Sequence, residues 1–158
     1  MATDPNPGRP ATAPADVELT LAEAYRFELR FGPADSAALL TDLGPPLGAH
    51  RGPDPERLLA AAVANCLAAS LLFALRKLGQ EPGGLRARAT VQLARNAQGR
   101  QRVGGIAVAL HLGVPAAGLP RLDRALAQFE AYCTVTESVR AAFPVDVQVF
   151  DGQGQRLR

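Results

Sequence analysis

The chain has 158 residues, a net charge of +2 and a hydrophobic fraction of 47%, which together predict one globular domain with a substantial core. Its basic residues are almost all arginines, several of them between positions 86 and 102, but aromatic residues make up only 5% of the chain and tryptophan is absent. Because nucleic-acid surfaces usually combine basic residues with stacking aromatic side chains, this composition favours a solvated basic strand face and argues against nucleic-acid binding.

The two ends of the sequence differ in composition from its middle. Residues 1–16 are rich in Pro, Ala and Asp and lack an apolar stretch, so we expect a disordered tail and no secretory signal. Two cysteines without an export signal favour a reducing cytoplasm. We therefore expect one domain over residues 17–151 and a frayed end over 152–158.

The apolar run Leu58–Leu75 is long enough for a membrane span. The run is rich in alanine, however, and Asn65 and Ser70 interrupt it. A helix that is apolar on all sides can instead be the central helix of a compact domain or dimer. We favour that interpretation and expect no membrane association.

Alternating apolar and polar residues predict the strands of the first part of the chain. Residues 17–31 alternate and predict one half-buried strand, and the turn residues 32–36 predict that 37–42 return as its hairpin partner. Asp54 then provides an N-cap and Pro55 a first helical residue for a long helix that ends at Gly79.

The second part of the chain predicts two more strands, two helices and a last strand. Residues 85–94 and 103–112 alternate on either side of a turn at 96–99, with a bulge at Gly104 and Gly105. Pro120 begins a helix, Thr134–Ala142 form a shorter one, and 145–149 form the last strand. The order β-β-α-β-β-α-α-β predicts an α+β fold with antiparallel hairpins.

Cys66 and Cys133 are the only cysteines and lie in or beside two separate predicted helices. A free cysteine is usually a small buried hydrophobe. A reversible pair would instead suit a peroxidase cycle, in which one thiolate is oxidised to sulfenic acid and the second thiol resolves it. If Cys133 opens a helix, backbone N–H groups would lower its pKa, and Thr134 or Thr136 could cap the same turn.

A reactive Cys66 needs a cation nearby to favour its thiolate. Arg26, Arg30, His50 and Arg51 are the candidates before the long helix, and the sequence alone does not choose among them. Glu56 precedes Cys66 by ten residues, about 15 Å along a helix and some 80° around it, so it cannot touch the thiol. It either complements the helix dipole or orients an arginine.

Other kinds of site have little support in the sequence. His50 and His111 lie far apart and do not have metal-ligand spacing with the cysteines. No glycine-rich phosphate loop follows a predicted strand, and no nucleophile elbow for a serine triad is found.

Two segments resemble the osmotically inducible protein C and organic hydroperoxide resistance (OsmC/Ohr) family. Residues 52–67 are similar to the family's Pro-x-x-Leu-Leu-x-Ala-Ala-x-x-x-Cys helix, with an acidic residue ten positions before the cysteine. Residues 129–139 are similar to its Cys-x-Val-(Ser/Thr)-x-(Ser/Ala) segment. With the strand order, the resemblance covers about residues 25–151.

The resemblance implies an OsmC-like fold, with antiparallel sheets wrapped around long central helices in an intertwined homodimer and with active sites at the subunit interface. It implies a cysteine-based peroxidase for organic hydroperoxides, needing no haem, flavin or metal and reduced by a lipoyl-type dithiol. Cys66 would be the peroxidatic thiol and Cys133 the resolving thiol. Glu56 would pair with an activating arginine, for which we prefer Arg30, at a strand end, to Arg26 and Arg51.

The arginine context departs from the family pattern, because the glycine-rich hairpin that carries this arginine in the hydroperoxidases is absent here. An alternative function is therefore a non-catalytic OsmC-like protein that binds a small hydrophobic ligand at the dimer cleft.

Overall fold

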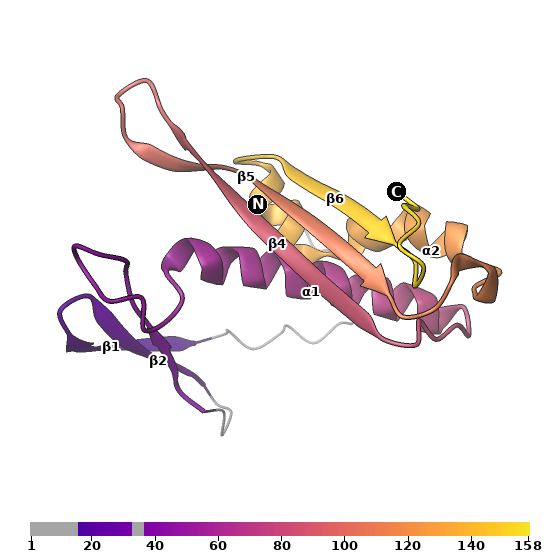
Figure 1. Cartoon of the computed structure of the whole chain (residues 1–158), viewed down its shortest axis with the longest axis horizontal. Coiled ribbons are helices and arrows are strands. Elements are labelled where there is room, and N and C mark those ends of the chain that lie inside the picture. The colour runs from indigo at the N-terminus through magenta and orange to yellow at the C-terminus, as the bar shows by residue number, and fades with distance from the viewer. Residues whose placement is uncertain (1–15, 33–36) are drawn as a thin grey trace, which may run out of the picture. The chain divides into compact units, whose positions relative to one another are not determined.

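The computed structural model describes residues 16–32 and 37–158, and the predicted tail therefore lies, except for Asp16, outside the described residues. The chain divides into two compact units, Met1–Asp54 and Pro55–Arg158. Figure 1 labels the elements of both units. The prediction of one domain over residues 17–151 stays a prediction, because the expected domain is intertwined with a second chain.

The N-terminal unit holds a three-stranded antiparallel sheet of β1 (Val17–Glu23), β2 (Arg26–Phe31) and β3 (Leu39–Thr41) (Figure 1). The single strand predicted over residues 17–31 is wrong, because the chain reverses between β1 and β2 and pairs Glu23 with Arg26. Ala24 takes a positive φ of 46° at this turn. Glycine usually occupies such positions, so the sequence carries no turn signal here.

The return of the chain after residues 32–36 is confirmed, since β3 pairs antiparallel with β2. Asp42 follows β3 and fixes the loop that leads to the long helix. Its carboxylate accepts hydrogen bonds from the backbone N–H groups of Ala49 and Arg51, each at 3.1 Å. These bonds, with that of Arg51 the largest cause, hold the pKa of Asp42 below its ordinary value.

The long helix α1 (Pro55–Lys77) begins at the predicted proline. It ends as predicted: Gly79 takes a φ of 70°, and the N–H of Gln80 donates to the carbonyl of Leu75 at 3.0 Å. By length and composition α1 could cross a membrane, but the core helix of a compact domain passes the same test. Its residues Val63, Leu67, Leu71 and Leu75 are fully buried against the rest of the C-terminal unit.

The second sheet has the order β4 (Leu85–Arg95), β5 (Gln101–Leu112), β6 (Val145–Phe150). The predicted hairpin of β4 and β5 is confirmed, and so is the bulge. Gln92 lies opposite Gly105 whereas Leu93 lies opposite Val103, which leaves Gly104 as the extra residue.

Strand β6 differs from the prediction of antiparallel pairing, because it lies parallel to β5. A parallel neighbour needs a crossover connection, which the short helices η1 (Ala116–Gly118), α2 (Leu122–Gln128), η2 (Phe129–Tyr132) and α3 (Thr134–Arg140) provide. Figure 1 shows α1 running along the sheet. The α+β class is as predicted.

The last residues are ordered, in contrast to the frayed end predicted for 152–158. The N–H of Leu157 donates to the carbonyl of Val149 at 2.7 Å, and Arg156 lies opposite Phe150. Asp151 fixes the turn between them, since its carboxylate accepts the N–H groups of Gln153 and Gln155, each at 2.9 Å. Residues 156–158 therefore pair antiparallel with the end of β6, at the edge of the sheet.

Candidate active site

Cys66 lies near the middle of α1, on the border between its buried and exposed sides. The flanking Val63 and Leu67 are fully buried, whereas Asn65 is exposed and Cys66 itself is half-buried. The helix thus holds this thiol at the edge of the core, where a small molecule from solvent can reach it.

Cys133 lies at the junction of η2 and α3 and is the N-cap residue of α3. Its side chain has no exposed surface. Its backbone N–H donates to the carbonyl of Glu130 at 2.9 Å, and its thiol donates to Oγ1 of Thr136 at 2.8 Å. Both the backbone and the sulfur of Cys133 are therefore held in place.

The fold brings the two cysteines together from these separate elements. Burial raises the pKa of the Cys133 thiol, and the neighbouring Cys66 thiol raises it further. Hydrogen bonds from Thr136 act in the opposite direction but are outweighed. The backbone N–H of Thr136 lowers the pKa of Cys133, as expected for a helix N-terminus, but desolvation outweighs this contribution and the net shift is upward.

Both thiols are free, and their environments differ. The buried Cys133 stays protonated at neutral pH because its pKa is raised, and it is a poor nucleophile in that form. Cys66 is the accessible member of the pair. The Cys66 thiol can thus react with a reagent from solvent, whereas the nearby Cys133 thiol is shielded from it.

A network of charges holds the two elements on either side of Cys133. Glu130 of η2 is 9% exposed and pairs with Arg140 of α3, which also pairs with Glu137 at 2.6 Å. Arg158 pairs with Glu130 at 2.7 Å and lies over the ring of Phe129, 6.0 Å from its centroid. The network fixes η2 against α3 and so fixes the position of Cys133.

Glu56 lies in the first turn of α1 and is half-buried. Among the residues that the structure describes, no ion pair joins it to an arginine. The structure thus places Glu56 on the same helix as Cys66, ten residues earlier, and brings these two side chains into no direct contact.

The three candidate arginines belong to the N-terminal unit and have different partners. Arg30 pairs with Glu28 at 2.5 Å, and its side chain is 65% exposed. Arg51 lies 4.0 Å from Glu23 and is similarly exposed. Solvent screens both of these charges.

Arg26 is the most shielded of the three arginines. Its side chain is 22% exposed and pairs with Glu23 at 2.9 Å. Its Nε is buried and has no hydrogen-bond partner within the described part of the chain. Arg26 also lines a hollow of about 240 Å³ together with Asp42 and Arg51.

Thr136 and Glu130 are contributors that the sequence analysis did not identify in these roles. The sequence predicts Thr136 only as a helix cap, although a cysteine at an N-cap with a hydroxyl three residues later has the spacing of a capping box. The partners of Glu130 follow from packing, and no sequence pattern predicts them. Across the described residues, no group of three or more His, Cys, Asp or Glu side chains is arranged to hold a metal ion.

The fold and the thiol pair define an α+β protein with two free cysteines, close enough for one thiol to affect the pKa of the other. A family model described as "OsmC-like protein" matches residues 48–148, and the chain belongs to this family. None of the curated proteins matches the sequence.

Solved structures share the fold at low sequence identity. An OsmC-like protein of unknown function from Vibrio cholerae superimposes with a TM-score of 0.73 at 16% identity, covering 88% of this chain and 100% of that one. The organic hydroperoxide resistance protein OsmC from Legionella pneumophila gives 0.69 at 15% identity, with 89% and 98% covered. The organic hydroperoxide resistance protein OhrB of Bacillus subtilis gives 0.63 at 15% identity, with 86% and 97% covered.

Proposed function

We propose that this protein is a thiol-dependent peroxidase that reduces organic hydroperoxides, and hydrogen peroxide more weakly, in defence against oxidative stress. Membership of the OsmC-like family and the names of two structurally similar proteins, both organic hydroperoxide resistance proteins, support this role. A cytoplasmic location is part of this proposal, as the sequence predicts.

The observation that carries the proposal is the proximity of an accessible and a buried thiol. The half-buried Cys66 is the peroxidatic residue in this proposal, because it can meet a hydroperoxide. The buried Cys133 is the resolving residue in this proposal, because its raised pKa keeps it from competing for the peroxide while it lies near enough to Cys66 to be affected by that thiol.

The proposed cycle has three steps. The Cys66 thiolate attacks the terminal oxygen of the hydroperoxide, the O–O bond breaks, and the alkoxide takes a proton to leave as an alcohol. The resulting Cys66 sulfenic acid condenses with the Cys133 thiol, which forms a disulfide and releases water. An external dithiol of the lipoyl type then reduces this disulfide and is itself oxidised to its cyclic disulfide. The cycle requires no haem, flavin or metal.

Glu56 and one arginine complete the proposed site. The arginine would favour the Cys66 thiolate and stabilise the developing alkoxide, and Glu56 would orient the guanidinium. Arg30 is the candidate preferred from the sequence, but its charge is exposed and already paired. Arg26 is the stronger competitor, because its buried Nε is free to donate a hydrogen bond.

A homodimer is the proposed assembly, because apolar side chains that a single chain leaves exposed lie on both units. In the C-terminal unit Phe73 of α1 is 65% exposed and Tyr132 is 70% exposed. In the N-terminal unit Leu19 and Leu21 of β1 are 57% and 58% exposed. Burial of such surface between two copies would stabilise an intertwined dimer.

The test is the consumption of cumene hydroperoxide with dihydrolipoamide as reductant. We expect Cys66→Ser to abolish turnover and Ala69→Ser, an exposed substitution one turn further along α1, to leave it intact. Equal rates for Cys66→Ser and the wild type would reject the proposal. Arg26→Gln, Arg30→Gln and Arg51→Gln, compared in the same assay, identify the activating arginine, whose loss we expect to lower kcat/KM by about a hundredfold or more.

A second candidate function is the binding of a small hydrophobic ligand at the dimer cleft, with both thiols inert. The exposed Phe73 and Tyr132 favour it, since with Lys77 and Arg124 they line a hollow of about 140 Å³. Mass spectrometry of the purified protein for a bound apolar compound separates the two functions. An inactive Cys66 together with a co-purified ligand would select the second.

A further inference from the structure

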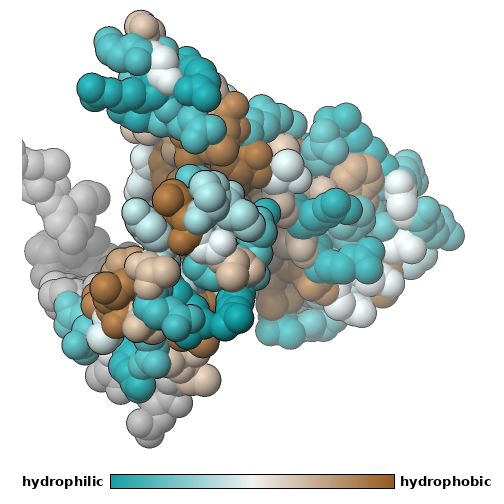
Figure 2. Space-filling model, turned by 60° about the vertical axis from the view of Figure 1, so that its left-hand side comes forward, coloured by the Kyte–Doolittle hydropathy of each residue, from teal (hydrophilic) through white to brown (hydrophobic). Residues whose placement is uncertain are grey.

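The segment that contains the β4–β5 hairpin carries positive charge that the proposed thiol chemistry does not use. Residues 82–122, which include the whole β4–β5 hairpin, contain six arginines and no aspartate or glutamate. The tip of this hairpin forms the hydrophilic end at the top of Figure 2. Within this acid-free segment, one place combines a cation, an imidazole and a hollow.

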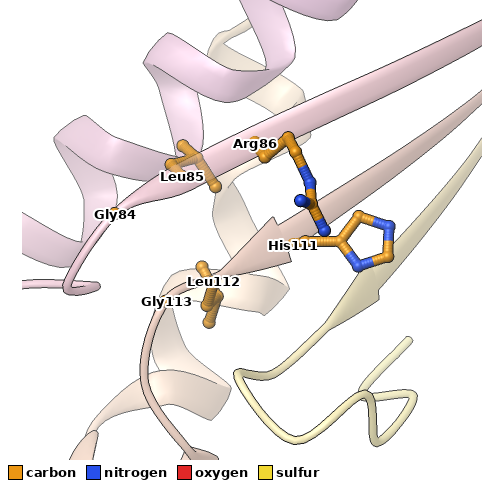
Figure 3. Close-up of a pocket in the computed structure, with 6 residues that line it drawn as sticks. All are labelled: Gly84, Leu85, Arg86, His111, Leu112 and Gly113. Carbon is orange, nitrogen blue, oxygen red and sulfur yellow. The ribbon is translucent and has the colours of Figure 1, made fainter.

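Arg86 of β4 and His111 of β5 are directly opposite each other at the end of the hairpin. Their side chains project to the same side of the sheet, and Figure 3 shows Arg86 reaching from β4 toward the His111 ring. Neither residue has an ion-pair partner among the described residues. Two basic side chains in opposed positions repel each other when both are charged, and a bound anion would remove that cost.

The third strand supports the His111 ring. Phe150 of β6 is the parallel neighbour of His111, and the two rings stack with centroids 4.9 Å apart and planes inclined by 12°. Stacking fixes the orientation of the imidazole, so that its ring N–H is directed without help from a ligand. A pre-oriented donor loses little entropy when it binds.

The hollow beside this pair has a volume of about 260 Å³ and is lined by Arg86, His111, Leu85, Leu112, Gly84 and Gly113. On the side lined by Gly84 and Gly113, two backbone segments approach each other closely. A Cβ on Gly113 would lie 2.3 Å from the carbonyl oxygen of Gly83, so no other residue fits there. The backbone therefore leaves the space in front of the two side chains open. The glycine segments themselves are held together, because the N–H of Gly113 donates to the carbonyls of Pro82 and Gly84.

We propose that Arg86 and His111 form a binding site for the phosphate group of a small molecule. The guanidinium offers two parallel N–H donors and the imidazole a third from another direction, which suits an anion with three free oxygens better than a planar carboxylate. The hollow is smaller than the roughly 300–1,000 Å³ of typical ligand pockets, so it accommodates the phosphate and only a few further atoms. The site uses none of the residues assigned to peroxide reduction.

The test is a titration of the full-length protein with inorganic phosphate at constant ionic strength, followed by NMR of the backbone amides and the His111 ring. We expect saturable shifts at Gly84, Gly113 and His111, and binding weaker by about tenfold or more in Arg86→Gln, for the loss of a charged hydrogen-bonding partner. Arg88→Gln is the matched control, because Arg88 lies on the same face of β4 one row away, opposite Ala109. It should bind phosphate as the wild type does.

Three results would overturn the inference. The first is the absence of saturation at millimolar phosphate. The second is an equal loss in Arg86→Gln and Arg88→Gln, which would indicate attraction to a diffuse basic face. The third is acetate binding as tightly as phosphate, which would reject the assignment to a phosphate group. Peroxide reduction by Arg86→Gln should equal that of the wild type, so the two sites are tested independently.

Discussion

The Cys133 thiol donates a hydrogen bond to Oγ1 of Thr136 across 2.8 Å, and neither residue has any exposed surface. Once the thiol has lost its proton, the Thr136 hydroxyl can rotate and donate to the thiolate, so Thr136 lowers a pKa that burial and Cys66 raise.

Thr136→Val should slow the resolving step. The valine keeps the volume but removes the hydroxyl, which raises the pKa of Cys133 further and leaves less thiolate to attack a Cys66 sulfenic acid. We expect disulfide formation to slow by roughly threefold to tenfold, as for one hydrogen bond of about 0.5–1.5 kcal/mol. Samples quenched at set times after a pulse of hydroperoxide are measured by intact mass, and the growth of the disulfide form gives the rate.

Thr136→Ser keeps the hydroxyl and should restore most of the rate. Thr134→Val is the matched control, since Thr134 is exposed on the same helix. An unchanged rate in Thr136→Val would show that this hydrogen bond plays no part in resolution.

Cys133→Ser should separate oxidation from resolution. Without a resolving thiol, the Cys66 sulfenic acid has no internal partner and should accumulate after one equivalent of hydroperoxide. Trapping with dimedone and intact-mass measurement detects it as one adduct per chain. Full steady-state turnover by Cys133→Ser would contradict the two-cysteine cycle.

Glu130→Gln should destabilise the protein by about 2 kcal/mol, because it leaves Arg140 and Arg158 without their shared buried carboxylate. We place the value below that of a fully buried pair because both arginines are partly exposed. Urea denaturation followed by circular dichroism measures the change. Glu137→Gln removes only an exposed partner of Arg140 and should cost about 0.5 kcal/mol or less.

Asp42→Asn should lower stability in a pH-dependent way. The folded state lowers the pKa of Asp42, so its contribution is present above the ordinary value and is lost as the pH falls through the folded pKa. The difference in free energy of unfolding between wild type and Asp42→Asn should therefore be large at pH 7 and shrink in acid. Asp146→Asn, exposed on β6, is the control. A difference that does not vary with pH would contradict the assignment.

Phe73→Glu should weaken self-association. A charge placed on the exposed apolar side of α1 would be buried in the proposed dimer without a partner. We expect sedimentation equilibrium to give a dimer for the wild type and a monomer, or a dimer weakened by about a hundredfold, for the variant. Arg76→Glu changes an exposed charge on the same helix and serves as the control. A monomeric wild type would reject the proposed assembly.

The sequence alone predicted the elements whose signals are local. The start of α1 at Pro55 and its end before Gly79 depend on capping chemistry within a few residues, and the β4–β5 hairpin depends on alternation and a turn. The bulge at Gly104 was predicted in the same way. The family segments around Cys66 and Cys133 are also local, so membership of the OsmC-like family was predictable.

The tertiary structure decided what depends on distant partners. Nothing in residues 145–150 specifies pairing parallel to β5, because the crossover helices determine that choice. The order of residues 152–158 arises from hydrogen bonds to Val149, and the turn at Ala24 lacks the glycine that usually marks one. The proximity of Cys66 to Cys133 involves two helices far apart in sequence, and whether a thiol is reactive or inert depends on burial and neighbours, which only packing creates.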